Sequence, residues 1–387
     1  MALDFSLTET QEMLLKSVRA FIDKEVRPKV KAAEENESFP LELFRKFYDM
    51  GLMGVSIPEE DGGHGLGYLE SLLIAKELTK ASVSMMVGWT VQGAMIPTIL
   101  SKFATPQQKQ IYLQAALKGE KIGALGLTEH QHGNDLRHIE TTAYLDGDEW
   151  VIKGSKAFIT LGPVADFFLV LCTNDTKKGL SGSQLIIVEK DDPGLTVVKQ
   201  KKHANRGAET AELFFEDCRV PKDRMFGDGN SAIKDVLNTL NIERLIVCGR
   251  ALGLAEESLH LALNYSKERV QFGKPIGEFQ SIAFKLAQMK AELEAARWLV
   301  YRSAWLLDSG SKIQDIVEDV SMAKLIATET ASRIADEALH IHGGWGIIEG
   351  VSEIHRFFND SKVALVTVGS SEIQRRVIAR RMGLRCE

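Results

Sequence analysis

The sequence predicts an α+β protein in which a small β domain lies between two helical regions. Three observations support this prediction. Apolar residues recur at three-to-four spacing through the first third of the chain, as they do in amphipathic helices. Short β-rich runs separated by turn sequences begin near Lys121, and helical spacing returns from Ala232 onward. We therefore expect an N-terminal helical domain over residues 1–120, a middle β-sandwich or barrel domain over 121–230 and a C-terminal four-helix bundle domain over 231–387.

The N-terminal region opens with a clear helical pattern over residues 8–26. Thr8 and Gln11 have the spacing of a capping box at the start of this helix, and Pro28 is expected to end it. The glycine-rich segment Ile57–Gly65 predicts an irregular turn. Further short helices are expected over residues 41–51, 69–81, 95–103 and 106–117.

The middle region contains five short β-rich runs separated by turn-forming residues such as Asp146-Gly147-Asp148 and Asp192-Pro193-Gly194. This spacing is typical of antiparallel strands. The runs cover residues 150–153, 167–172, 184–188, 195–199 and 211–215. After them, four long helical segments are expected up to Met382, interrupted at His342–Gly346.

Composition limits the function classes. The chain has 387 residues, 44% hydrophobic and 26% charged, with a net charge of −6, so nucleic acid is an unexpected partner. No apolar run approaches the roughly 18 residues of a membrane span, and we expect no membrane association. The four cysteines are scattered and form no CxxC pair, which predicts reduced thiols in the cytoplasm.

Several common catalytic motifs are missing from the sequence. The glycine-rich stretches lack the strand–turn–helix context of a dinucleotide fingerprint, and there is no phosphate loop, HExxH or GxSxG. His130, His132 and His138 lie close together with Glu129 and Asp135, but their spacing matches no standard ligand set. We therefore expect a polar loop there and no metal site.

One carboxylate stands out by its position. Glu243 lies beside an apolar helical stripe and directly before Arg244. A buried carboxylate in such a place could serve as a general base, whereas an exposed one would only form a helix-surface ion pair. The residues alone therefore leave two classes open: a pocket enzyme with a buried carboxylate, or a helical interaction protein.

Six segments, taken together and in order, resemble the acyl-CoA dehydrogenase family of flavoenzymes, and the resemblance covers the chain from Phe5 to Gly383. The segments are Ile57–Gly65, Leu127–Asp135, Gly154–Thr160, Arg269–Gln280, Ile341–Gly346 and Gly369–Arg375. They are similar to the family's first-domain loop, its Thr-Glu-Pro-x-x-Gly-Ser-Asp signature, its Gly-x-Lys-x-Trp-Ile-Thr flavin segment and its C-terminal motifs. Phe158 takes the place of the family's Trp, and Asn134 that of a Ser.

The resemblance implies FAD as the cofactor, shared across a subunit interface of a homotetramer. The isoalloxazine ring of the flavin would form hydrogen bonds with Leu127, Thr128 and Thr160. Phe158 would pack against this ring, and Asn134 would lie near both the flavin and the substrate. Arg269 would meet the pyrophosphate, because a planar guanidinium can donate twice to it. The remaining implied cofactor contacts are Phe272, Gln280, His340, Gly343, Gly344, Ser370 and Glu372.

The resemblance also implies the reaction: α,β-dehydrogenation of an acyl-CoA thioester, with electrons passed to an electron-transferring flavoprotein. The family's commonest base precedes the last Gly-Ser, but Val368 stands there and cannot accept a proton. A minority, including isovaleryl-CoA-type dehydrogenases, carries the base on a helix just before an Arg, which matches Glu243. Asn241, Arg244 and Gly369 would contact the substrate.

Three alternatives remain open beside a short- or branched-chain acyl-CoA dehydrogenase. The first is an enoyl-CoA reductase of the crotonobetainyl-CoA reductase type, which also has the helix Glu-Arg. The second is a dehydrogenase acting on a carrier-protein thioester. The third is a catalytically inactive protein that retains the fold.

Overall fold

The computed structural model describes residues 6–227 and 232–386. Within it the chain forms two compact units that interleave along the sequence. The first consists of Met1–Ala32, Gly67–Met86 and Arg244–Glu387, and the second of Ala33–Leu66 and Val87–Glu243. The order of helices and strands, with helical regions before and after a β region, confirms the predicted α+β class.

The helices are α1 (Glu9–Phe21), α2 (Arg27–Asn36), α3 (Glu42–Asp49), α4 (Tyr68–Ala81), α5 (Val83–Trp89), α6 (Ile96–Phe103), α7 (Pro106–Gln108), α8 (Gln114–Leu117), α9 (Ala232–Glu268), α10 (Gln280–Asp308), α11 (Val317–His342), α12 (Ile354–Val366) and α13 (Ser371–Arg381). Three π-helical segments join consecutive helices, at Ile22–Val26, Thr90–Met95 and Lys109–Leu113.

In the first unit, α11 is the central helix. It packs against α10, α12 and α13, and α10 also packs against α4. Alanines at Ala323, Ala327, Ala331 and Ala335 are all buried and recur every four residues, so α11 presents a row of small side chains to its neighbours. The last predicted helical segment is divided into α12 and α13 by a turn at Thr367–Ser370.

The helix α4 crosses α9 at very close range. A Cβ atom placed on Gly253 would lie 2.3 Å from the carbonyl oxygen of Lys76, and one on Gly249 would lie 2.7 Å from that of Leu72. Only glycine permits this backbone approach. The contact fixes α4 against the part of α9 that follows Glu243.

The first helix confirms one prediction and corrects another. Thr8 and Gln11 form a reciprocal capping box at the start of α1. Pro28, however, does not end the helical run: a π-helical turn at Ile22–Val26 follows α1, and α2 then starts at Arg27. Pro28 thus lies inside a continuous helical run, directly after the π-helical turn that changes the backbone hydrogen-bond pattern before it.

A buried ion-pair network joins α1 and α4. Glu77, with a side chain 4% exposed, accepts hydrogen bonds from Arg19 Nε and Nη2, each at 3.0 Å, and one from Lys80 at 3.2 Å. Burial alone would raise the Glu77 pKa, but the Arg19 hydrogen bond and the charges of Lys80 and Lys76 outweigh it and lower the pKa to about 2.

This network makes the protein sensitive to acid. A carboxyl whose pKa is lowered on folding stabilises the fold above its unfolded pKa of 4.5 and loses that contribution as the pH falls toward 2. We expect Glu77→Gln to cost about 3 kcal/mol at pH 7 and much less at pH 3, as measured by thermal unfolding. Asp23→Asn, which breaks the exposed Asp23–Arg27 pair, is the matched control and should cost under about 0.5 kcal/mol. Equal losses for Glu77→Gln at both pH values would contradict this account.

The second unit contains one seven-stranded sheet, in the order β1-β4-β2-β3-β7-β6 with β5 paired to β4. The strands are β1 (Gly123–Gly126), β2 (Thr142–Asp146), β3 (Glu149–Thr160), β4 (Phe167–Thr173), β5 (Ser183–Glu189), β6 (Leu195–Gln200) and β7 (Thr210–Pro221). The pairs of β3 with β2 and β7, of β7 with β6 and of β4 with β5 are antiparallel, as predicted, whereas β1 and β2 pair with β4 in parallel.

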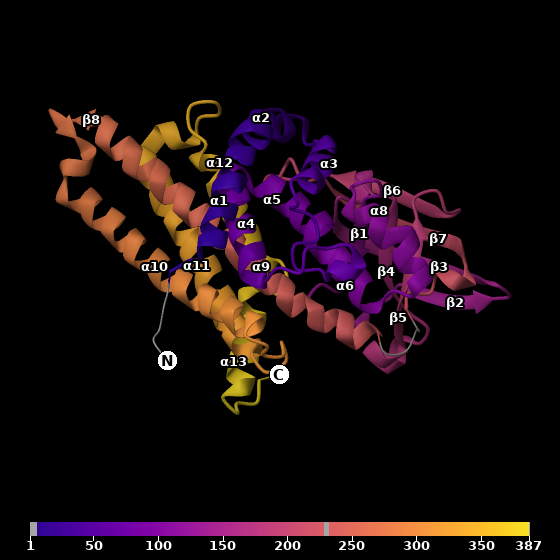
Figure 1. The fold of residues 1–387 in the computed structure, drawn as a ribbon. Helices are drawn as coiled ribbons and strands as arrows, with labels where there is room; N and C mark the ends of the chain where they lie inside the picture. The colour runs from indigo at the N-terminus through magenta and orange to yellow at the C-terminus, as the bar shows by residue number, and fades with distance from the viewer. Residues whose placement is uncertain (1–5, 228–231, 387) are drawn as a thin grey trace. The chain divides into compact units, whose positions relative to one another are not determined.

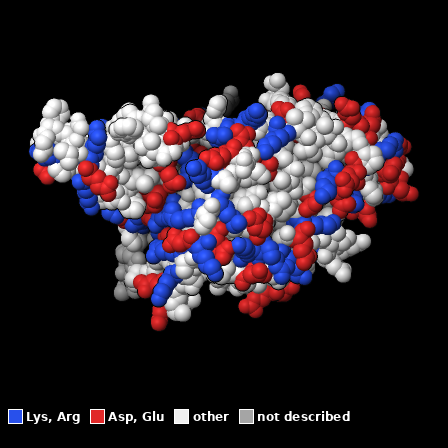
Figure 2. All heavy atoms as spheres, turned by 90° about the horizontal axis from the view of Figure 1, so that it is seen from above, with Lys and Arg blue, Asp and Glu red and all other residues white. Residues whose placement is uncertain are grey.

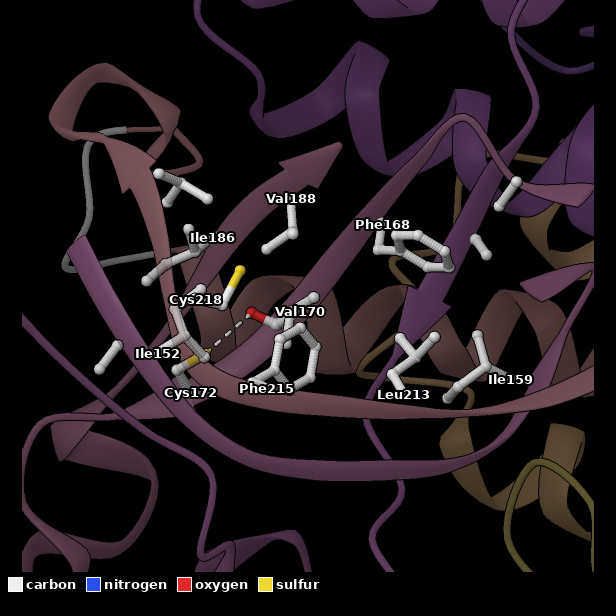
Figure 3. Close-up of a cluster of buried hydrophobic side chains, with 14 residues drawn as sticks. Ile152, Ile159, Phe168, Val170, Cys172, Ile186, Val188, Leu213, Phe215 and Cys218 are labelled. Atoms are coloured by element: carbon white, nitrogen blue, oxygen red, sulfur yellow. Dashed lines mark hydrogen bonds between the residues drawn. The ribbon is translucent and has the colours of Figure 1, made fainter. Parts of the chain in front are cut away.

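The sheet curls around a single apolar core. Alternate residues of β3, β4, β5 and β7, including Ile152, Phe168, Ile186 and Leu213, point into one shared interior (Figure 3). Two free cysteines, Cys172 and Cys218, lie in this core, and burial raises the pKa of each thiol to about 12. These cysteines act as packing groups, because the reactive thiolate form is suppressed.

One expectation about apolar runs is wrong. Val83–Phe103 forms a continuous helical segment of 21 residues with a mean hydropathy of 1.3, long and apolar enough to cross a membrane by length and composition. The same apolar window is 89% buried within the structure, as is usual for a core helix. Polar residues such as Thr90, Gln92 and Ser101 divide this segment, so the sequence contains no uninterrupted apolar run there.

On the surface in view in Figure 2, Lys and Arg are intermixed with Asp and Glu.

Candidate functional site

The loop after β1 carries the first group of predicted cofactor residues. Leu127 and Thr128 follow the strand directly, and the carbonyl of Thr128 accepts a hydrogen bond from the amide of Ala157 on β3 at 2.8 Å. The carbonyl of Leu127 accepts a hydrogen bond from Lys156 Nζ at 3.3 Å. The structure therefore places Leu127 and Thr128 beside the strand that bears Phe158 and Thr160.

A buried ion pair holds this loop in place. Lys156 Nζ lies 2.7 Å from Glu129 Oε1, and the two side chains are 0% and 6% exposed. The two Glu129 oxygens also accept hydrogen bonds from the amides of Glu140, at 2.7 Å, and Thr141, at 2.9 Å. The carboxylate is thus bonded on both oxygens, so the cost of burying it is offset by well-placed partners.

Phe158 is aimed outward by a backbone irregularity. The register of β3 against β7 shifts between Lys156 and Ile159, and Phe158 has a φ of +61° with 65% of its side chain exposed. Bulges of this kind redirect side chains next to functional sites. An exposed aromatic ring beside the Leu127–Thr128 loop is the surface that a flat ring system could stack on.

The histidine-rich loop around Asn134 shows internal ion pairing. The Asp135 carboxylate accepts hydrogen bonds from Arg137 Nε at 3.0 Å and lies 2.8 Å from His138 Nδ1, which lowers the Asp135 pKa. Among the described residues no group of three His, Cys, Asp or Glu is placed to hold a metal ion. Asn134 itself is exposed.

A second site lies in the first unit, at the ends of α9 and α11. A cavity of about 500 Å³ is lined by Arg269, Gly343 and Gly344 together with residues that the sequence did not indicate. Tyr265 is among these, and its ring stacks on that of His342, from the predicted Ile341–Gly346 segment, with centroids 4.4 Å apart. The other lining residues are Gln271, Ile276, Ile341, Trp345 and Ile348.

The glycines keep this cavity open. A Cβ placed on Gly343 or Gly344 would meet no atom within 4 Å, so side chains there would project into free space. Gly343 also has φ +59° and ψ −143°, a conformation that only glycine adopts readily. An arginine, two stacked rings and a glycine backbone fit the pyrophosphate and adenine of a dinucleotide.

Three predicted cofactor residues do not line this cavity. Phe272, at the tip of the β8 (Val270–Gln271) and β9 (Lys274–Pro275) hairpin, is 94% exposed, and Gln280 and His340 are exposed as well. Figure 1 shows this hairpin at the end of the long helices. A role of Phe272, Gln280 and His340 in binding the cofactor remains a prediction.

Glu243 is the most perturbed acid of the site. It lies on α9, is 5% exposed, and burial raises its pKa from 4.5 to about 8. Its neighbour Asn241 is also buried. A carboxyl group with a pKa near 8 can both accept and return a proton close to neutral pH, which is what general acid–base catalysis needs.

Arg244 contacts the turn between α12 and α13. Its Nε donates to the carbonyl of Val368 at 3.1 Å, and a Cβ on Gly369 would lie 3.5 Å from its Nη2. Ser370 stands at the N-cap position of α13 without a side-chain capping hydrogen bond, and its side-chain hydrogen bond lowers the pKa of exposed Glu372. The predicted substrate residues Arg244 and Gly369 are therefore brought together, at the position where Val368 replaces the family's commonest base.

Comparison with known proteins shows which family the chain resembles over nearly its whole length. Residues 8–120 match the family "Acyl-CoA dehydrogenase, N-terminal domain", residues 124–218 the corresponding middle domain and residues 230–383 the C-terminal domain. The chain is 38% identical to acryloyl-CoA reductase (NADH) of Anaerotignum propionicum, with 98% of this chain and 95% of the relative aligned. It is 36% identical to the human mitochondrial short-chain specific acyl-CoA dehydrogenase, with 96% and 90% aligned.

The solved structures agree with these matches. Butyryl-CoA dehydrogenase from Megasphaera elsdenii superposes with a TM-score of 0.92 at 34% identity, with 99% of this chain and all of that chain covered. The predictions of family, fold, enzyme class and FAD as cofactor are confirmed. The chain belongs to the acyl-CoA dehydrogenase family, FAD-dependent oxidoreductases that act on CH–CH bonds of acyl-CoA thioesters.

Proposed function

We propose that the protein interconverts a short-chain acyl-CoA and its α,β-unsaturated partner, with Glu243 exchanging the α proton. The observation that carries this proposal is the buried Glu243 carboxyl with a pKa of about 8. Val368 cannot take a proton, so the usual position of the base offers no alternative. The short-chain class is supported by relatives named for short-chain substrates.

The residues of the chain divide the remaining tasks. FAD, when bound, supplies the acceptor for the β hydrogen. Phe158 with the Leu127–Thr128 loop would hold its flavin ring, and Arg269 with Gly343 and Gly344 would hold its pyrophosphate and adenine. Desolvation around Glu243 makes its ionised form a stronger base than a carboxylate in water.

The same pKa favours a second candidate, reduction of an enoyl-CoA. At pH 7 a carboxyl with a pKa near 8 is mostly protonated, so Glu243 is ready to donate a proton to the α carbon. A relative named as an acryloyl-CoA reductase fits this direction. Crotonobetainyl-CoA reductase-like chemistry therefore stands beside dehydrogenation, whereas a branched acyl chain and a carrier-protein thioester rest on resemblance alone.

We further propose that the protein assembles as a homotetramer and exchanges electrons with an electron-transferring flavoprotein in the cytoplasm. Aromatic side chains are exposed along α10 at Phe284, Trp298 and Trp305, at separations of fourteen and seven residues, which suits a second helix of another copy. Three buried free cysteines fit a reducing compartment. Sedimentation of the purified protein tests the tetramer.

Anaerobic titration of the flavin decides among these activities. The oxidised protein is titrated with saturated acyl-CoAs and the reduced protein with enoyl-CoAs, both with acyl groups of three to six carbons and each also as a carrier-protein thioester. Bleaching by a saturated acyl-CoA supports dehydrogenation, and recovery of the flavin colour on adding an enoyl-CoA supports reduction. A protein that binds FAD but responds to no thioester would refute the proposal.

The two directions should respond to pH in opposite ways. Proton abstraction needs ionised Glu243, so the second-order rate of bleaching should rise about tenfold per unit up to pH 8 and then level off. Proton donation needs the neutral carboxyl, so flavin reoxidation by an enoyl-CoA should be constant below pH 8 and fall above it. Stopped-flow absorbance between pH 6 and 9.5 measures both; flat profiles would exclude Glu243 as the proton carrier.

A further inference from the structure

The turn between α12 and α13 contains an unusual backbone conformation. Val368 has a φ of +53°, in the left-handed region, and is followed by Gly369 at +84°. Glycine adopts this region freely, but a β-branched residue is a rare and strained occupant of it. Such strain persists only where surrounding contacts enforce it.

Four side chains enforce the conformation of this turn. Lys324 Nζ and Gln374 Nε2 each donate to the Gly369 carbonyl at 2.9 Å. Arg244 Nε donates to the Val368 carbonyl at 3.1 Å, and Arg250 donates to Thr367 Oγ1 at 2.9 Å. Together these donors bond to each of the three consecutive residues 367–369.

The donor Lys324 carries a buried amino group. It lies on α11 with no exposed surface, and its second hydrogen bond goes to the carbonyl of Leu365 at 3.5 Å, near the end of α12. Burial lowers the pKa of its ammonium group to about 8. Burying an amine costs free energy, and an apolar side chain could fill the same space at lower cost. The two hydrogen bonds from Lys324 to backbone carbonyls therefore indicate that this residue shapes the turn.

The turn is linked to the proposed catalytic carboxyl through the chain itself. Arg244 directly follows Glu243, and its guanidinium bonds to the carbonyl of Val368. If Val368 relaxed to a negative φ, its peptide would rotate and this carbonyl would leave Arg244. The residue next to Glu243 would then lose its anchor.

We propose that Lys324 is a positioning residue, which holds Val368 in the left-handed conformation so that Arg244 stays anchored beside Glu243. The proposal rests on the proposed function, in which Glu243 exchanges the α proton. It gives Arg244 a contact with the turn beside the contact with substrate that the sequence predicted.

The test is a double-variant cycle between Lys324→Met and Val368→Gly. In the valine background, Lys324→Met should slow flavin bleaching by the best acyl-CoA at least tenfold, because Val368 relaxes. In the glycine background the same change should cost less than threefold, because glycine keeps φ near +53° without help. Val368→Ala is the matched control and should not rescue, because alanine keeps the left-handed penalty.

Thermal unfolding provides a readout that is independent of activity. Val368→Gly relieves strain only while Lys324 enforces it, so it should raise Tm by about 2 °C in the wild-type background and by much less beside Lys324→Met. If Lys324→Met fails to fold, Gln374→Ala, which removes the other donor to Gly369, takes its place in the same cycle.

The outcomes separate the two proposals. A wild-type protein whose flavin responds to no thioester defeats the proposed function, while the thermal cycle still tests the turn. Bleaching by wild type, combined with an undiminished rate in Lys324→Met or an equal loss in both backgrounds, overturns the role of Lys324. Equal Tm increments in the two backgrounds overturn it as well.

Discussion

Replacing Glu243 by glutamine is expected to slow reduction of the flavin by an acyl-CoA by about 10²–10⁴-fold while FAD stays bound. Glutamine has nearly the shape of glutamic acid but cannot accept the α proton. Since Val368 stands at the family's commonest base position, the chain has no second carboxyl there to take over. Stopped-flow bleaching and the ratio of FAD to protein measure the two halves of this expectation.

The same variant should be more stable than wild type at and above neutral pH. A carboxyl whose pKa is raised on folding holds a proton that the unfolded chain releases, so stability falls as the pH rises from 4.5 to about 8. Glutamine removes this loss, which amounts to about 3 kcal/mol at pH 7.

Glu256, on the same helix, is the natural contrast. It pairs with Lys80 at 2.5 Å and with Arg297 at 2.7 Å, and these cations lower its pKa despite burial. Glu256→Gln should therefore destabilise the protein without removing proton transfer. Glu243 would not be the base if the flavin of the Glu243→Gln variant were bleached at the wild-type rate, or if this variant lost thermal stability as Glu256→Gln does.

The sequence located Glu243 but could not decide its state. Its position beside an apolar stripe was compatible with a buried base or with a surface ion pair, because burial depends on the helices that pack over α9. Only the packed structure shows it 5% exposed, with burial as the cause of its raised pKa. Because Arg244 follows Glu243, the resemblance to the family's helix Glu-Arg motif favours the buried base over the surface ion pair.

Contacts between distant segments account for most of what the sequence missed. Arg269 and the Gly343-Gly344 pair came from motifs, but the stack of Tyr265 on His342 brings together two helices with no local signal. Tyr265 does lie four residues before Arg269, which directly follows α9, and the Arg269 amide donates to the Tyr265 carbonyl at 2.9 Å. The left-handed Val368 is likewise invisible to local propensity, which would place a β-branched residue in a strand.

Backbone features escaped prediction where tertiary packing overrode local rules. The strand Gly123–Gly126 has little β propensity, yet it pairs with β4 and is largely buried. Pro28 was expected to end a helix, but the π-helical turn before it shifts the proline into the first turn of a new helix.

Lys156→Met is expected to be the most damaging single change to the β region. It leaves the buried Glu129 carboxylate without its cation, which typically costs 3–5 kcal/mol. It also removes the donor to the Leu127 carbonyl, so the loop proposed to hold the flavin loses one of its ties to β3. Both the Tm and the FAD content of the purified protein should fall.

The exposed Lys153 on the same strand is the matched control. It pairs with Asp217 at 2.9 Å, with side chains 53% and 63% exposed, so Lys153→Met should cost under about 1 kcal/mol and retain FAD. A shift of Lys156→Met no larger than that of Lys153→Met would mean that the buried pair contributes nothing to the loop.

The double variant Lys156→Met/Glu129→Gln separates the charge from the hydrogen bonds. A glutamine at 129 is neutral, so it removes the unpaired charge, and its single amide oxygen can still accept from one of the two backbone amides, those of Glu140 and Thr141, which bond to different oxygens of Glu129. We expect it to regain most of the lost Tm, because replacing both charges of a buried pair is far less costly than removing one. FAD content should recover only in part, since the Leu127 carbonyl still lacks its donor. Full recovery of FAD would show that the charge balance of the pair, rather than the tie from Lys156 to Leu127, holds the flavin loop.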